Sequence, residues 1–181
     1  RPGPVWLEIP LDIQSSVIKD KKKIKKFYKR KYSYSNKNIK KFSNKIKKSK
    51  KPVIVIGNGI KQSGTRKNFL NFVEKYSLPF FTSRFAYDLF PFSNKFNLGL
   101  LGIKGQLYSK KILKEADLII FLGCRVAPTV YSEGNTKNKK LKKVIIDIDE
   151  HSLNHPLVKF DLKIKHDLRF FFDSFFKNFK D

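Results

Sequence analysis

The most informative run in this 181-residue chain is Pro52-Val53-Ile54-Val55-Ile56-Gly57-Asn58-Gly59. A proline opens it, a block of apolar residues follows, and two glycines close it. An uninterrupted apolar run of this length is typical of a strand that is buried on both faces of a parallel sheet. Glycines directly after such a strand let the backbone come close to a ligand. We therefore predict a parallel strand at residues 53–56 with a glycine turn after it.

Similar apolar runs recur along the chain, and segments with helical periodicity separate them. Further strands are predicted at residues 80–82, 118–122, 144–148 and 162–164. Helices are predicted at residues 65–76, 106–115 and 168–179, the first with an apolar stripe of Phe69, Phe72, Val73 and Tyr76. Strands that alternate with helices predict an α/β fold, namely a Rossmann-like, doubly wound parallel sheet of about six strands.

The formal net charge of the chain is +25, and most of the excess lies in one segment. Residues 19–51 contain 16 Lys and Arg30 against Asp20, which leaves +16 on 33 residues. Such a charge ordinarily suggests nucleic acid or an anionic membrane surface as partner. The whole chain has 34 Lys and 6 Arg, however, whereas base-edge and bidentate phosphate recognition favours Arg. We predict a solvated basic linker and no specific nucleic acid partner, with a nucleic-acid-binding domain as a third hypothesis.

Two elements are predicted before residue 52. Residues 5–9 (Val-Trp-Leu-Glu-Ile) indicate a short strand closed by Pro10, with no partner strand nearby in the sequence. Ile39, Phe42 and Ile46 are three and four residues apart, which places them on one face of a helix whose other face carries lysines. Part of the basic segment is therefore predicted to be an amphipathic helix.

Length and composition exclude several classes of protein. A chain of 181 residues suffices for one packed domain with an arm but not for two large domains. The 40% of apolar residues rules out wholesale disorder, and no apolar run approaches the roughly 20 residues of a membrane helix. The sequence has no Met and no secretory signal, so we expect a piece of a longer cytoplasmic polypeptide. Cys124 is the single cysteine and forms no internal disulfide, which agrees with a reducing compartment.

Residues suited to meeting a nucleotide follow each of four predicted strands. They are Gly57 and Gly59, Thr82, Gly123 and Arg125, and Asp147 and Asp149. Glycine admits close backbone approach, Arg binds phosphate in a fork, and carboxylates accept from ribose hydroxyls. The usual dinucleotide fingerprint is nevertheless incomplete, because the third glycine and an acid about 20 residues onward are missing. Ordinary NAD binding at the first turn is therefore disfavoured, and Gly57 and Gly59 alternatively only turn the chain.

No catalytic or metal-binding residue is predicted in this chain. Asp147 and Asp149 could project to the same side, but no third metal ligand lies near them in the sequence. Cys124 lacks a nearby His base or second Cys and is expected to serve in packing. His151 and His155 lie in a loop-like context and are expected at the surface or in capping roles.

Several blocks, taken in order, resemble one known enzyme family. Residues 1–14 resemble the closing strand of the pyrimidine-binding domain in thiamine diphosphate enzymes of the acetolactate synthase type. Residues 51–176 resemble the central domain of the same family. The blocks that carry this resemblance are residues 51–59, the glycine-rich residues 99–105, the strand and its end at residues 116–125, and residues 144–149.

The resemblance implies three parts in the chain and a function for the longer protein. The parts are the last strand of a truncated pyrimidine-binding domain at 1–14, a basic linker with an amphipathic helix at 15–50, and a central domain of the DHS-like NAD/FAD-binding type at 51–181. The implied protein is a cytoplasmic dimer or tetramer that decarboxylates a 2-keto acid and joins the product to an acceptor carbonyl. Its thiamine diphosphate and Mg²⁺ would be held outside this chain, which would itself be inactive. A free-standing nucleotide-binding α/β module without catalysis is the alternative.

In acetolactate synthases proper, the central domain holds FAD in a non-redox role. Carried over by position, the resemblance implies that the cofactor-binding residues of this chain are Gly57, Gly59, Thr82, Lys104, Gly105, Gly123, Arg125, Asp147, Asp149 and Asp167. Two departures argue against FAD here. Lys104 stands where those synthases carry His, and Val126-Ala127 replaces an acidic pair after the Arg.

Overall fold

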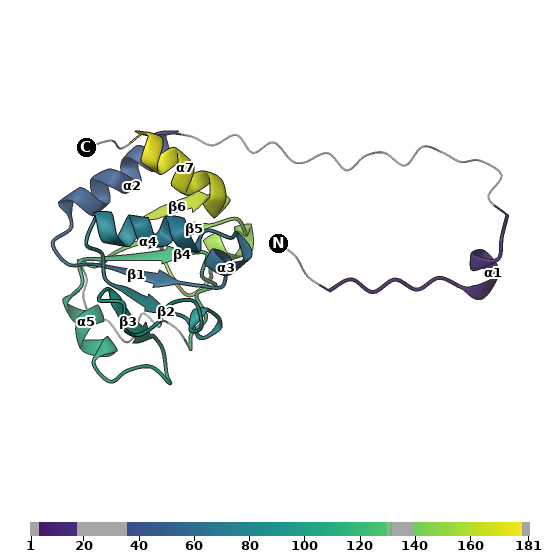
Figure 1. Ribbon diagram of the computed structural model, residues 1–181, viewed down its shortest axis with the longest axis horizontal. Coiled ribbons are helices and arrows are strands. Elements are labelled where there is room, and N and C mark those ends of the chain that lie inside the picture. The colour runs from purple at the N-terminus through teal and green to yellow at the C-terminus, as the bar shows by residue number, and fades with distance from the viewer. Residues whose placement is uncertain (1–3, 18–35, 130, 132–139, 179–181) are drawn as a thin grey trace. The chain divides into compact units, whose positions relative to one another are not determined.

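The computed structural model describes residues 4–17, 36–129, 131 and 140–178. Six parallel strands form one sheet in the order β3-β2-β1-β4-β5-β6 (Figure 1). The strands are β1 (Pro52–Ile56), β2 (Phe80–Thr82), β3 (Asn97–Leu100), β4 (Leu118–Leu122), β5 (Lys142–Asp147) and β6 (Leu162–Lys165). Strand order reverses between β1 and β4, which makes their carboxyl ends the switch point where open α/β sheets bind ligands. The predicted Rossmann-like, doubly wound fold is confirmed.

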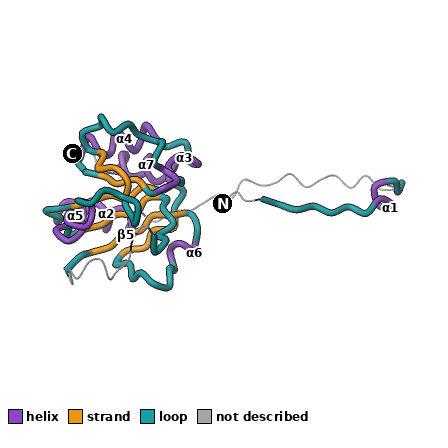
Figure 2. Tube along the Cα trace, turned by 90° about the horizontal axis from the view of Figure 1, so that it is seen from below, coloured by secondary structure: helices purple, strands orange, loops and turns teal. Residues whose placement is uncertain are grey.

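Helices cover both faces of this sheet, and alternate strand residues point to opposite faces. Ile54 and Ile56 pack in a core with α2 (Asn36–Lys48), α4 (Arg66–Lys75) and α7 (Leu168–Asn178). Val53 and Val55 pack in a second core with residues of α5 (Ser109–Glu115) and α6 (Glu150–Leu153). Figure 2 shows the strands as a central layer between helices. The remaining short elements are α1 (Leu11–Gln14), α3 (Gly59–Gln62) and the 3₁₀ turn η1 (Arg84–Ala86).

The helix predicted inside the basic linker is present as α2, but it is part of the packed domain. Ile39 and Phe42 are fully buried, and Ile46 is 9% exposed. The ring of Phe42 lies 5.4 Å from that of Phe171 and 5.6 Å from that of Phe175, both in α7. Residues 34–181 form one compact unit that includes α2, because a helix with three buried apolar residues cannot stay in solvent. The predicted domain bounds stay a prediction.

A half-buried carboxylate holds the end of α2 to the sheet. Asp117, which precedes β4, accepts hydrogen bonds from the Ser49 hydroxyl and from the backbone N–H groups of Lys50 and Lys51 at 2.7 and 3.1 Å. Burial by itself would raise the pKa of Asp117, but these donors outweigh burial and lower it. The junction between α2 and β1 is thus held against the start of the neighbouring strand.

Two sequence predictions differ from the structure. Residues 4–10 form no strand, and one helical turn, α1, follows them; no strand within the described residues offers them backbone partners. Their assignment to another domain stays a prediction. Strand β3 is not among the predicted strands, because it is short and contains Gly99 at a φ of 82°. No helix in the described ranges combines the length and apolarity that a membrane span requires.

Candidate functional site

Three predicted glycines meet where β1 and β4 end. The N–H of Gly59 donates to the carbonyl of Gly123 at 2.9 Å, and the N–H of Gly57 donates to Leu122 at 3.1 Å. A Cβ on Gly57 would lie 2.3 Å from the Gly123 oxygen, and one on Gly59 would lie 2.6 Å from the Gly123 Cα. Gly123 has a φ of 53°, which disfavours other residues. Backbone packing alone therefore explains these glycines, while contact with a ligand remains a prediction.

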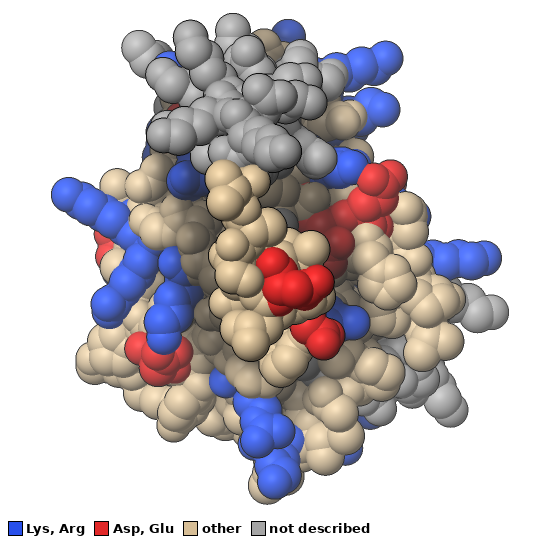
Figure 3. Space-filling view, turned by 90° about the vertical axis from the view of Figure 1, so that its right-hand side faces the viewer, with Lys and Arg blue, Asp and Glu red and all other residues tan. Residues whose placement is uncertain are grey.

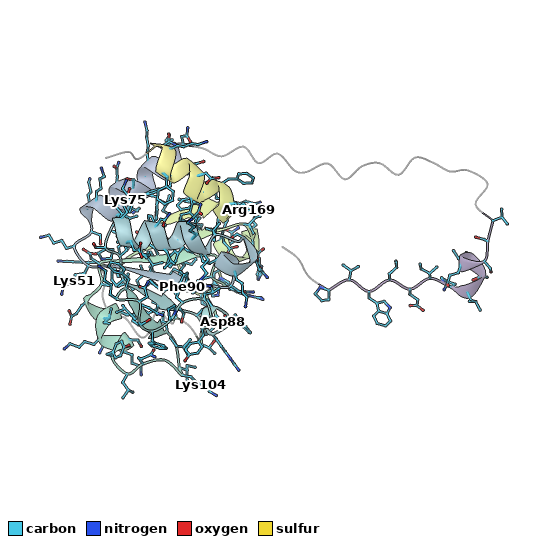
Figure 4. All side chains as sticks on the ribbon, viewed as in Figure 1. Lys51, Lys75, Asp88, Phe90, Lys104 and Arg169 are labelled. Atoms are coloured by element: carbon cyan, nitrogen blue, oxygen red, sulfur yellow. The ribbon has the colours of Figure 1, made fainter. Side chains whose placement is uncertain are left out.

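Thr82 and the loop after β3 form the next part of this edge. Thr82 is 1% exposed, and its hydroxyl donates to the Gly99 carbonyl at 3.3 Å. Gly105 lies against the end of β3, where a Cβ would be 2.3 Å from the Leu100 oxygen. Lys104 of the same loop is exposed, and Figure 4 places it at the lower margin of the domain. Thr82 and Gly105 thus have structural partners, whereas Lys104 points to solvent.

The carboxylates at the ends of β5 and β6 mostly serve the local backbone. Asp147 accepts from the N–H of Asp149 at 2.9 Å. Asp149 caps α6, accepting from the N–H of His151 at 3.3 Å and from the Ser152 hydroxyl at 3.1 Å. The N–H of His166 donates to the Asp147 carbonyl at 3.0 Å, so the two strand ends lie together. Each of the two carboxylates therefore accepts a hydrogen bond from the backbone N–H two residues further along the chain.

Asp167 is the most tightly held acid of the edge, and sequence reasoning missed its partner. Its side chain is 6% exposed and accepts from the N–H, Nε and Nη2 of Arg169 at 2.9, 3.2 and 2.6 Å. The hydrogen bonds from the Arg169 side chain are the main cause that lowers the pKa of Asp167, against the opposing effect of burial. The spacing Asp-Leu-Arg at 167–169, an acid directly before a helix, was the available signal.

Asp167→Asn is expected to lower the free energy of unfolding by about 2 kcal/mol at neutral pH, since charge-assisted hydrogen bonds are lost. The folded-state pKa of Asp167 is depressed, so its contribution is present above the unfolded value, about 3.9, and is lost as the pH falls toward the folded value. Urea unfolding from pH 7 to pH 3 should therefore show the variant and the parent converging in acid. The exposed Asp173→Asn in α7 is the control, and an equal loss there would contradict this role.

Arg125 and Cys124 follow β4 with opposite properties. The Arg125 side chain is exposed and makes no hydrogen bond or ion pair within the described residues. Cys124 is fully buried, and burial raises the pKa of its thiol to about 12. A thiol with such a pKa stays protonated and is no nucleophile at neutral pH. The packing role predicted for Cys124 agrees with this, whereas Arg125 offers an exposed cation at this edge.

The described ranges contain no group of three His, Cys, Asp or Glu that could bind a metal ion. His155 accepts from the N–H of Leu157 at 3.2 Å, so it caps a turn as expected. Lys and Arg side chains lie around the margin of the molecule in the view of Figure 3. Among the described residues of this edge, no nucleophile is paired with a base.

One cavity lies at the opposite, amino edge of the sheet and was not anticipated. Its volume is about 300 Å³, and its lining includes Pro52, Pro79, Ile112 and Ser77. Lys51 and Glu115, also in the lining, form an ion pair at 2.9 Å with both side chains at least half exposed. This cavity is therefore separate from the candidate site, which lies at the carboxyl ends of the strands.

Comparison with protein families gives a match over most of the chain. Residues 39–174 match the family described as "Thiamine pyrophosphate enzyme, central domain". The match begins within α2, in agreement with the packing of that helix in the domain.

Individual relatives are longer than this chain. It is 33% identical over 172 residues to the acetolactate synthase large subunit of Lactococcus lactis, which covers 93% of this chain and 30% of the relative. It is 31% identical to the acetolactate synthase isozyme 1 large subunit of Escherichia coli, over 84% of this chain and 27% of the relative. A 3D-(3,5/4)-trihydroxycyclohexane-1,2-dione hydrolase of Bacillus cereus is 33% identical over 60% of this chain and 17% of the relative. The chain thus spans less than a third of each of these relatives.

Proposed function

This chain belongs to the family of thiamine pyrophosphate enzyme central domains, and from that membership we propose that it is the central domain of an acetolactate synthase-like enzyme. The observation that carries the proposal is the extent of the similarity, which covers 93% of the chain in the lactococcal synthase but 60% in the dione hydrolase. The proposed enzyme decarboxylates a 2-keto acid and joins the product to an acceptor carbonyl.

The proposed role of this chain in that reaction is structural. Thiamine diphosphate supplies the carbanion chemistry when it is bound in such an enzyme. The residues present do not fit this cofactor, because the sequence contains no Gly-Asp-Gly motif and the described part of the chain has no metal-binding group. The domain, with helices packed on both faces of its sheet, would instead fix the positions of the flanking domains. We place the enzyme in the cytoplasm as a dimer or tetramer, with neither nucleic acid nor membrane as a specific partner.

We further propose that the domain works without a bound flavin. Three groups that would meet a nucleotide are engaged within the chain: Thr82 with Gly99, Asp149 with α6, and Asp167 with Arg169. Arg125 is the one predicted phosphate ligand of this edge whose side chain is exposed and unengaged within the described residues, apart from Lys104 at the margin.

A domain graft tests the proposed function. Residues 39–174 of this chain would replace the matching residues of the lactococcal synthase, and acetolactate formation from pyruvate would be measured. We expect the graft to retain activity, because the central domain supplies support and no reacting group. A folded, assembled graft that binds thiamine diphosphate but makes no acetolactate would contradict the proposal. The same graft in the dione hydrolase would show whether the domain is specific to synthases.

The isolated chain is expected to bind neither thiamine diphosphate with Mg²⁺ nor FAD. Titration calorimetry should show no heat of binding for thiamine diphosphate, and the purified protein should lack flavin absorbance. The sequence has no Gly-Asp-Gly motif, and the described part of the chain has no metal-binding group for the first cofactor; groups of the chain itself occupy much of the site of the second. Micromolar affinity for either cofactor would overturn this expectation. If flavin bound, loss of binding in Arg125→Ala would place it at the ends of the strands.

A further inference from the structure

The cavity at the amino edge of the sheet has the composition of a small-molecule site. Its lining is apolar where it is buried or half-buried, as at Val53 of β1 and Ile112 of α5. The polar residues of the lining are exposed, and they are Lys50, Lys51, Ser77 and Glu115. Apolar walls with a few polar groups are typical of ligand pockets, and its volume of about 300 Å³ is within their range. In Figure 4, Lys51 marks this edge at the left margin of the domain, where β1 begins.

Hydrogen bonds hold the walls of this cavity together. The N–H of Ile54 donates to the Pro79 carbonyl at 3.0 Å, which joins β1 to the turn before β2. The N–H of Lys50 donates to the Asp117 side chain at 2.7 Å, which joins the start of β1 to the segment between α5 and β4. The segments around the cavity are therefore fixed to one another, and a ligand would not have to order them on binding.

The charges in the lining favour an anion over a cation. Glu115 is already paired with Lys51 at 2.9 Å. The side chain of Lys50 is exposed and makes no ion pair within the described residues. The net charge of +25 on the whole chain also attracts anions to its surface. Lys50 is therefore the cation of this lining that is available to a carboxylate.

Ser77 occupies a position at which glycine is the usual residue. The N–H of Leu78 donates to the Val73 carbonyl at 2.9 Å, which is the hydrogen bond of a Schellman motif after α4, with Ser77 in the place of its glycine. The φ of Ser77 is 49°, a left-handed conformation that costs free energy for a residue with a Cβ. Its hydroxyl has no hydrogen-bond partner within the described residues. Residues held in this conformation cluster at ligand sites, so the Ser77 hydroxyl is a second candidate contact.

We propose that this cavity binds a small carboxylate with an apolar body, whose carboxylate meets Lys50 and the Ser77 hydroxyl while its body packs on Val53 and Ile112. An enclosed cavity of about 150 Å³ holds benzene, so one of about 300 Å³ suits a ligand of roughly a dozen non-hydrogen atoms. The cavity lies at the edge of the sheet opposite the candidate site. The inference therefore goes beyond the proposed function and does not depend on it.

An NMR titration of the chain with phenylbutyrate, a carboxylate of this size, tests the proposal. We expect a dissociation constant of about a millimolar, as for other ligands this small, with amide shifts around the cavity. Phenylbutanamide has the same shape without the charge and should bind about fivefold more weakly. Equal binding of the carboxylate and the amide, tighter binding of the cationic phenylbutylamine, or no amide shift with phenylbutyrate would each overturn the proposal.

A pair of lysine variants locates the bound carboxylate. Lys50→Gln should weaken the binding of phenylbutyrate about fivefold and leave that of phenylbutanamide unchanged. Lys67→Gln is the matched control, because Lys67 is exposed in α4, lies outside the lining and carries the same charge. Its affinity should equal that of the parent. An unchanged affinity in Lys50→Gln, or an equal loss in Lys67→Gln, would contradict the site.

Ser77→Gly separates ligand binding from folding. The variant should bind phenylbutyrate about threefold more weakly, because the hydroxyl is lost. Its midpoint of urea unfolding should rise, because glycine adopts the left-handed conformation without a steric cost. Weaker binding in a more stable protein would support the contact, since it cannot come from damage to the fold. A rise in stability with unchanged affinity would overturn the assignment of Ser77 to the site.

Discussion

Gly57→Ala is expected to lower the free energy of unfolding by about 3 kcal/mol. The added methyl group would lie 2.3 Å from the Gly123 oxygen and 2.4 Å from the Cys124 Cα, and both are backbone atoms. Neither can move without disturbing the pairing of β1 with β4, the central pair of the sheet. Urea unfolding followed by far-ultraviolet circular dichroism would measure the loss.

The control for Gly57 is Gly64, which also lies between β1 and α4. Gly64 has a φ of 68°, but an added Cβ would meet nothing within 4 Å. Gly64→Ala should therefore cost about 1 kcal/mol from the left-handed backbone alone. Equal losses in the two variants would show that backbone contact with Gly123 is not the reason for glycine at residue 57.

Phe42→Ala is expected to cost about 4 kcal/mol, as for other fully buried aromatic residues. The Phe42 ring contacts three others, those of Phe72, Phe171 and Phe175, with centroids between 5.4 and 6.3 Å away. Truncation would leave a cavity between α2, α4 and α7 that rigid aromatic neighbours cannot fill. The midpoint of chemical unfolding is again the measurement.

Phe170→Ala is the matched substitution for Phe42→Ala. Phe170 lies in α7, next to the aromatic core, but is 46% exposed and is contacted by the Arg169 guanidinium at 5.7 Å. Its loss should cost no more than about 1 kcal/mol. If Phe42→Ala were as mild, α2 would be a linker helix and the domain would begin at residue 51 after all.

The strands and long helices were predictable because each carries its own pattern. The apolar runs at 53–56, 118–122 and 144–148 coincide with the adjacent parallel strands β1, β4 and β5. The stripe of Phe69, Phe72 and Val73 is the buried face of α4. Strand β3 could not be predicted in this way, because it is short, contains a glycine and has no continuous apolar run. Its pairing with β2 is what makes it a strand.

The position of the candidate site could be predicted from the sequence, but the hydrogen-bond partners of its side chains could not. The residues after β1, β2, β4 and β5 do gather at one edge, since parallel strands end on the same side. The sequence could not show that Thr82 bonds Gly99 or that Asp167 holds Arg169, because these contacts depend on loops that bring distant or flexible groups together. Ligand residues and capping residues have the same chemistry, so composition does not separate them.

The fold class, the family and the lack of a Gly-Asp-Gly motif can be read from the residues alone, since they follow from local apolar patterns and from the order of short blocks. Only the folded chain shows that the lysine-rich helix α2 is part of the core, that Gly57 and Gly123 pack against each other, and that apolar side chains are exposed in the loops beside β3. A residue is buried only when another element packs against it. An apolar pattern in the sequence identifies the face of a helix or strand that will be buried, but it does not identify the element that packs on that face.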